Sequence, residues 1–154
     1  MRMRAVIQRV TSATVLLNET GERRVIGPGL LTLLAIAPDD REQEARWLVD
    51  KLITLRIFED EEGKMDRSLL EIEAGEMLIV SQFTLLGDMR KGRRPSFTGA
   101  ARPEIARPLV ESFVRLVRET SLTVQTGEFG AEMSLEIVNN GPVTLVVDTP
   151  SGIR

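Results

Sequence analysis

The chain has 154 residues, and neither cysteine nor histidine is among them. The missing cysteine excludes disulfides, a thiolate nucleophile and zinc–sulfur sites, and the missing histidine excludes a Ser-His-Asp triad and histidine-ligated metals. Twenty basic and twenty-three acidic residues give a net charge of -3, so the protein is not expected to coat duplex nucleic acid, although a short local contact remains open.

The first residues carry no apolar signal-peptide region, and the longest apolar run, residues 30–37, is too short to span a membrane. We therefore expect a cytoplasmic protein that does not associate with a membrane. A chain of this length fits one domain. Because no repeat or linker divides the sequence, residues 1–154 are interpreted as a single domain.

Alternating apolar residues predict a long strand over residues 5–17, in which Arg9 interrupts the buried face. Residues 30–37 are nearly all apolar, which is typical of a strand buried on both faces. Asp40 and Gln43 then resemble a capping box at the start of a helix. The spacing of its apolar residues predicts that the buried face of this helix contains Ala45, Leu48, Leu52 and Leu55.

A further strand is predicted over residues 77–84, and it ends in Ser81-Gln82-Phe83-Thr84. Ser81 and Thr84 are candidate nucleophiles, but each needs a lysine or carboxylate in place of the missing histidine. A backbone amide of this segment can instead bind an oxyanion. Taken by itself, the segment is also compatible with an ordinary strand end that carries polar residues.

A cluster of positive charge follows at Arg90-Lys91-Gly92-Arg93-Arg94. Four cations within five residues of an acidic protein suit phosphates, and a solvated loop is the equally simple interpretation. Residues 103–120 are predicted to form the second helix. Pro103 suits a first turn, but the ring of Pro108 clashes with the preceding turn, so we expect the helix to start late or to bend there.

The segment that contains Phe129 and Met133 is another candidate site. Gly127 and Gly130 flank Phe129, so the backbone can approach closely and the ring can be presented. Aromatic rings and sulfur stack well on a nucleic acid base. Large apolar side chains are more often part of the core, so this pattern alone does not decide between the two roles.

Two final strands, over residues 133–138 and 143–148, are predicted on either side of Asn139-Asn140-Gly141-Pro142. Asn-Gly favours a tight hairpin, whereas a proline directly after it removes a hydrogen-bond donor from the next strand. A Gly141–Pro142 bond in the cis form would turn local carbonyls toward a ligand's amino group. The whole pattern predicts a single compact α+β domain with a mixed, barrel-like sheet and two main helices.

Seven segments together resemble the D-aminoacyl-tRNA deacylases of the bacterial type, the D-tyrosyl-tRNA deacylases. The resemblance covers nearly the whole chain, and the pair formed by Ser-Gln-Phe-Thr and Asn-x-Gly-Pro-Val-Thr is its most specific part. The matching segments are Ala5–Val10, Leu55–Phe58, Gly63–Met65, Ser81–Leu85, Gly92–Phe97, Thr126–Met133 and Asn139–Thr144.

The resemblance implies an editing hydrolase that cleaves the ester of D-aminoacyl-tRNA, with the acceptor end of the tRNA as its partner. It implies a homodimer in which Gly141 and a cis Pro142, held by Arg9, enter the other subunit's pocket and exclude L-residues. Glycyl-tRNA should then be cleaved as well, because glycine has no side chain to exclude.

The resemblance also assigns roles within the pocket. An amide near Phe83 would polarise the ester, while Ser81 and Gln82 shape the site and Phe129 and Met133 receive the terminal adenosine. Catalysis would use main-chain groups, water and a ribose hydroxyl, without metal or cofactor, and Thr84 as nucleophile is the competing mechanism. A non-catalytic module that binds RNA ends or nucleotides, a hydrolase of small esters and a purely structural dimer remain as alternatives.

Overall fold

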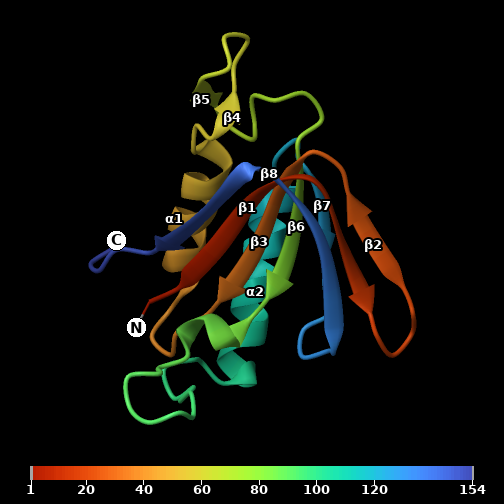
Figure 1. The fold of residues 1–154 in the computed structure, drawn as a ribbon. Helices are drawn as coiled ribbons and strands as arrows, with labels where there is room; N and C mark the ends of the chain where they lie inside the picture. The colour runs from red at the N-terminus through yellow and green to blue at the C-terminus, as the bar shows by residue number, and fades with distance from the viewer. Residues whose placement is uncertain (1, 154) are drawn as a thin grey trace.

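The computed structural model describes residues 2–153 as one layered α+β domain, and the two terminal residues of the expected domain, 1 and 154, lie outside the described part (Figure 1). Eight strands, two α-helices and one 3₁₀ helix are found in these residues. In chain order they are β1 (Arg4–Leu17), β2 (Arg23–Ile26), β3 (Gly29–Ala35), α1 (Glu42–Thr54), β4 (Phe58–Glu59), β5 (Met65–Arg67), β6 (Glu76–Ser81), η1 (Phe83–Leu86), α2 (Pro103–Arg118), β7 (Thr123–Thr126) and β8 (Met133–Asp148).

The main sheet is mixed, and its central strand is β1, which pairs with three other strands. β1 pairs antiparallel with β2 and β3 and also with β8, whereas β3, β6 and β7 run parallel. The sheet curves until β2 approaches β7, where the Arg24 guanidinium donates to the Thr126 carbonyl at 2.8 Å. This nearly closed arrangement confirms the expected single α+β domain with a barrel-like sheet and two main helices.

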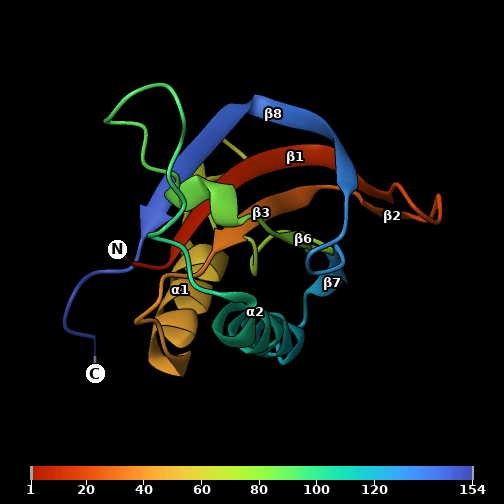
Figure 2. The same ribbon diagram turned by 90° about the horizontal axis from the view of Figure 1, so that it is seen from below.

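The curved sheet has an apolar core on each side. Both α-helices pack on one face, and β8 lies across the opposite side of the molecule (Figure 2). Leu30 and Met77 belong to the helix-side core, while Leu31 and Leu78 belong to the core enclosed by β1, β2 and β8. Strand β3 is therefore buried on both faces, as its continuous apolar sequence predicts.

The first helix is capped differently from the sequence interpretation. Its N-cap is Arg41, whose amide donates to the Glu44 carboxylate at 2.7 Å, so the predicted pairing of Asp40 with Gln43 is wrong. The carboxylate of Asp40 instead accepts from the amides of Met3 and Ala37. Burial raises the pKa of Asp40. Leu55, expected on the buried helix face, is the half-buried C-cap.

Strand β6 and helix α2 also differ from expectation. β6 ends at Ser81, and the rest of the predicted strand turns into η1. Helix α2 starts at Pro103, so the expected late start is wrong. It continues through Pro108, which is exposed. Water can therefore solvate the Glu104 carbonyl, which loses its helical donor at this position.

The last two predicted strands are one strand. β8 stays paired with β1 through an irregularity opposite Arg9, where residues 140–143 bulge out of the ladder. The side chain of Asn139 stabilises this bulge by accepting from the Val143 amide at 2.8 Å and donating to the Thr144 hydroxyl at 2.9 Å. The predicted turn is therefore a bulge, because β1 offers hydrogen bonds on both sides of it. No helix within residues 2–153 is long and apolar enough to cross a bilayer.

Candidate active site

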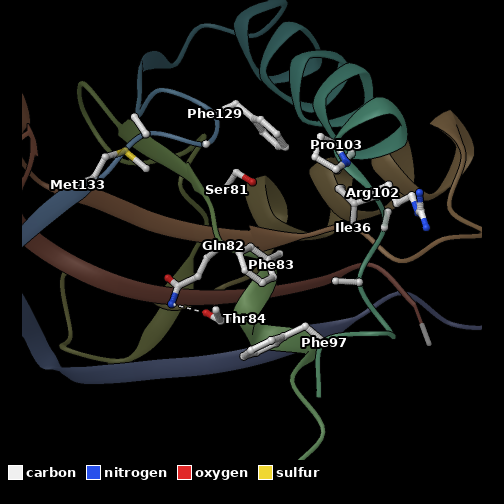
Figure 3. Close-up of a pocket in the computed structure, with 15 residues that line it drawn as sticks. Ile36, Ser81, Gln82, Phe83, Thr84, Phe97, Arg102, Pro103, Phe129 and Met133 are labelled. Atoms are coloured by element: carbon white, nitrogen blue, oxygen red, sulfur yellow. Dashed lines mark hydrogen bonds between the residues drawn. The ribbon is translucent and has the colours of Figure 1, made fainter. Parts of the chain in front are cut away.

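A cavity of about 540 Å³ opens where β6, η1, α2 and the start of β8 meet. Figure 3 shows side chains from these separate elements facing one space. Its volume suits a ligand of nucleoside size. The residues that line it are Ile36, Ser81, Gln82, Phe83, Thr84, Phe97, Ala100, Ala101, Arg102, Pro103, Ala106, Phe129, Gly130, Ala131 and Met133.

One wall of this cavity is the segment that the sequence singles out, Ser81 to Thr84. The Gln82 amide donates to the Leu34 carbonyl at 2.8 Å, which is the last link between this segment and the sheet. The chain then turns into η1, and the Gln82 side-chain amide donates to the Thr84 hydroxyl at 3.2 Å (Figure 3). The two side chains are thus paired with each other at the cavity wall.

The main-chain amides at the start of η1 are available to a ligand. Among residues 2–153, neither the Phe83 amide nor the Thr84 amide donates to a protein acceptor. The first amides of a helical turn have no partner within the turn, which explains why these two remain free. They lie in the segment that lines the cavity. Two such donors are the kind of group that stabilises an oxyanion.

The cavity offers little side-chain acid–base chemistry. Within the described residues, Arg102 is the one ionisable side chain in the lining, and no aspartate, glutamate or lysine lines the cavity. Arginine stays protonated at physiological pH and cannot act as a base. The hydroxyls of Ser81 and Thr84 therefore have no base in the lining to activate them. In the part of the chain that is described, no cluster of three metal-ligating side chains occurs.

The opposite wall contains Phe129 and Met133, as the sequence proposes. Met133 packs against Gly127 so closely that a Cβ on this glycine would come within 2.6 Å of the Met133 sulfur. A larger residue at this position would therefore require the end of the Met133 side chain to move. Figure 3 shows Phe129 beside the first turn of α2, with Ser81 between Phe129 and Gln82. These two predicted binding residues and the segment 81–84 share one cavity.

Arg9, Gly141 and Pro142 lie elsewhere in the single chain. None of them lines the cavity. Arg9 is only 5% exposed, and it donates to the Ile57 carbonyl at 2.7 Å and to the Asn140 carbonyl at 3.1 Å. The buried Arg9 guanidinium thus has two backbone acceptors, and one of them, the Asn140 carbonyl, lies in the bulge of β8. The Gly141–Pro142 bond is cis.

Sequence reasoning missed several residues of the cavity, including Ile36, Phe97 and Arg102. The Phe97 ring packs edge-on against Phe83 with a centroid separation of 5.3 Å, and Arg102 caps α2. Phe97 belongs to the basic segment, and its position directly after Pro95-Ser96 is the sequence feature that could have marked it as a cavity residue. Nothing in the sequence pattern places Ile36 or Arg102 beside Ser81.

The basic segment forms a closed loop next to this site. Asp88 and Ser96 exchange backbone hydrogen bonds of 2.7 and 2.8 Å, which join the two ends of the loop. The Asp88 carboxylate accepts from the Arg90 guanidinium at 2.7 and 2.9 Å. These hydrogen bonds lower the pKa of Asp88 to about 2. Lys91, Arg93 and Arg94 form no ion pair with the described residues.

Comparison with known proteins gives matches over nearly the whole chain. The family described as D-Tyr-tRNA(Tyr) deacylase matches residues 6–148. The D-aminoacyl-tRNA deacylase of Desulfatibacillum aliphaticivorans is 54% identical over 147 residues, covering 96% of this chain and 99% of the relative. The D-aminoacyl-tRNA deacylase of Clostridioides difficile strain 630 is 50% identical over 147 residues, covering 96% and 97%.

Two solved structures share the fold. A structure titled c-Myc DNA Unwinding Element Binding Protein has a TM-score of 0.88 at 39% identity, covering 96% of this chain and 99% of that chain. A probable eukaryotic D-amino acid tRNA deacylase has a TM-score of 0.85 at 22% identity, covering 96% and 100%. At that identity the second likeness shows the fold alone.

The fold, the cavity and these relatives define the protein as an enzyme of the hydrolase class. The alternative of a binding module without turnover is set aside for the same reason. The chain belongs to the D-aminoacyl-tRNA deacylase family.

Proposed function

We propose that this enzyme edits mischarged tRNA by hydrolysing the ester between a D-amino acid and the terminal adenosine in the 540 Å³ cavity. The observation that carries the proposal is the pair of free amides at Phe83 and Thr84 in a cavity lining that contains no side-chain base. Because its substrate is made where translation takes place, the enzyme acts in the cytoplasm.

The chemistry follows from the groups that the cavity provides. Water attacks the ester carbonyl carbon, and the carbonyl oxygen becomes an oxyanion that accepts hydrogen bonds from the amides near Phe83. The bond to the ribose oxygen then breaks, and the proton given up by water passes to the leaving oxygen through the neighbouring ribose hydroxyl. An aminoacyl ester is already activated, so positioning and oxyanion donors worth roughly 3–4 kcal/mol are enough.

Substrate binding is divided between the two walls of the cavity. The terminal adenine stacks near Phe129 and Met133, while Ser81 and Gln82 shape the space around the ester. The loop of Arg90 to Arg94 steers the acceptor strand through its phosphates, and the contact is short because the rest of the surface is acidic overall. Binding is therefore weak and salt-sensitive, with little dependence on tRNA sequence.

Selection of the D-amino acid requires a homodimer in this proposal. Gly141 and Pro142 do not line the cavity of their own chain, so we place them in the cavity of the partner subunit. Their carbonyls face the substrate's α-amino group and leave no room for an L side chain, and Arg9 holds the bulge from behind. Glycyl-tRNA mischarged on tRNA(Ala) is then also a substrate, because it has no side chain to exclude.

The test is hydrolysis of matched D-tyrosyl-, L-tyrosyl- and glycyl-tRNA by the purified enzyme, with and without a chelator. Rapid loss of the D- and glycyl esters, unchanged by chelator, is expected. Equal cleavage of both tyrosyl esters would contradict selection by the Gly141-Pro142 element, and stable glycyl esters would contradict selection by exclusion. Loss of activity with chelator would contradict the main-chain mechanism.

A further inference from the structure

An arginine outside the cavity backs the ring that receives adenosine in the proposed function. The guanidinium carbon of Arg107 lies 4.7 Å from the centroid of the Phe129 ring. Phe129 lines both the main cavity and a second cavity of about 420 Å³, whereas Arg107 lines only the second. The guanidinium therefore contacts the ring from the second cavity and not from the main one.

The charge of Arg107 is directed to this ring rather than to a carboxylate. Within residues 2–153, Arg107 forms no ion pair, whereas Arg115 on the same helix is paired with Glu42 and Glu119. A cation held over an aromatic face is attracted by the negative face of the ring. It also draws electron density from the opposite face, which makes that face a better stacking partner for an electron-rich purine.

The backbone that carries Phe129 is fixed by a second arginine. Arg24 of β2 donates to the Thr126 carbonyl at 2.8 Å and to the Glu128 carboxylate at 2.7 Å. Its side chain is 21% exposed, so the contact is partly shielded from water. The loop before Phe129 is thus tied to β2, and the ring itself is held by Arg107.

We propose that Arg107 is a positioning residue for substrate, which holds Phe129 between its guanidinium and the terminal adenine of the tRNA. The inference rests on the proposed function, because it takes Phe129 as the adenine-stacking residue. It adds a residue that contacts no part of the substrate and acts only through the ring. Its effect therefore falls on binding of the adenosine end and leaves the chemical step unchanged.

The experiment compares Arg107→Met with the matched variant Arg118→Met in hydrolysis of D-tyrosyl-tRNA. Arg118 lines the same second cavity and forms no ion pair with the described residues, but it does not stack on Phe129. Arg107→Met is expected to raise KM by about three- to fivefold at unchanged kcat, as removal of a cation–π interaction predicts. Arg118→Met should change KM by less than about twofold, and Arg107→Lys should restore part of the loss. Equal effects of the two methionine variants would show a general charge effect and overturn the proposal.

A double-mutant cycle with Phe129→Leu separates the inference from the function on which it rests. Arg107→Met should have no further effect on KM when Phe129 is already leucine. If its full effect persists there, Arg107 contacts the substrate directly and the positioning role is wrong. If Phe129→Leu leaves KM unchanged while its melting temperature shows an intact fold, the adenosine site of the proposed function fails instead.

Discussion

Thr84 is the residue at which two mechanisms make opposite predictions. Its hydroxyl accepts from the Gln82 side chain, and no base lines the cavity within the described residues. Thr84→Val keeps the shape of the side chain and the backbone amide. Loss of an oxyanion donor would cost about 10²–10³ in kcat, but this variant retains the donor. We therefore expect it to lower kcat for D-tyrosyl-tRNA by less than tenfold. Single-turnover hydrolysis measures this. A loss of more than about a thousandfold, with no change in melting temperature, would make Thr84 the nucleophile.

Arg9 allows a second test at the level of a single residue. Replacing it by methionine leaves the Ile57 and Asn140 carbonyls without their charged donor. Hydrogen bonds to charged groups contribute about 1.5–3 kcal/mol each, so loss of these two should lower the free energy of unfolding of Arg9→Met by about 3–6 kcal/mol. Urea unfolding gives this value.

Arg9→Met should also weaken discrimination between D- and L-tyrosyl-tRNA, because the bulge that carries Gly141 loses its support. Arg9→Lys is the control, since it keeps the charge but cannot donate to both carbonyls from a planar group. Unaltered discrimination in a folded Arg9→Met enzyme would separate Arg9 from chiral selection.

Single residues also show how far the sequence predicts the site. Ser81 and Thr84 are close in sequence, and Phe129 and Met133 are flagged by their glycines, so local patterns find both walls of the cavity. Phe97 enters the cavity because its ring packs on Phe83 of η1, and Arg102 does so because the neighbouring Ala101 amide donates to the Ile36 carbonyl at 2.9 Å. Such long-range packing leaves no periodic pattern, which is why these two residues were missed.

The basic loop is an element whose charges are not equivalent. Asp88 neutralises Arg90, and a carboxyl whose pKa is lowered to about 2 stays ionised at higher pH and loses the pair only as pH falls toward that value. Between pH 5 and 8, Lys91, Arg93 and Arg94 are therefore the cations open to phosphate.

This difference predicts how the salt dependence of tRNA binding responds to substitution. Changing Lys91, Arg93 or Arg94 to methionine should reduce the slope of log K against log salt by about 0.7 to 0.9 for each phosphate that the loop no longer neutralises. Arg90→Met should change the slope much less, and Asp88→Asn should steepen it by releasing Arg90. Filter binding at several salt concentrations makes the measurement. Equal slopes for all five variants would exclude the loop from phosphate binding.

At the scale of elements, the sequence predicts the helices and strands that their own residues determine. It misses the features that depend on pairing with another strand. The position of β3 follows from its continuous apolar run, and that of α1 follows from the helical spacing of its apolar residues. The short strands β2 and β7 were missed, because four residues of mixed polarity have no clear period. Asn139-Asn140-Gly141 has the chemistry of a turn, but the long strand β1 keeps both flanking segments in one ladder.

At the scale of the whole molecule, strand β8 is left with exposed apolar side chains in the single chain. Four apolar side chains of β8 are 38–61% exposed: Ile137, Val138, Leu145 and Val146. The other edge strands are short, whereas β8 runs for 16 residues. An exposed apolar surface of this kind marks a protein interface more often than a free surface. The proposed homodimer gives β8 a partner and brings the bulge of β8 to the other subunit's cavity.

Mixing two inactive variants tests whether each active site contains parts of both subunits. Ala131→Arg places a large side chain in the cavity of its own chain, and Pro142→Arg places one where the partner's cavity would be. Both residues are exposed in the single chain, so both variants should fold. If sites are shared, each heterodimer contains one blocked and one intact site. Random exchange of subunits should then restore about a quarter of the wild-type rate. If each site belongs to one chain, Pro142→Arg by itself stays active. Mixing it with Ala131→Arg then adds no activity beyond that of the Pro142→Arg subunits.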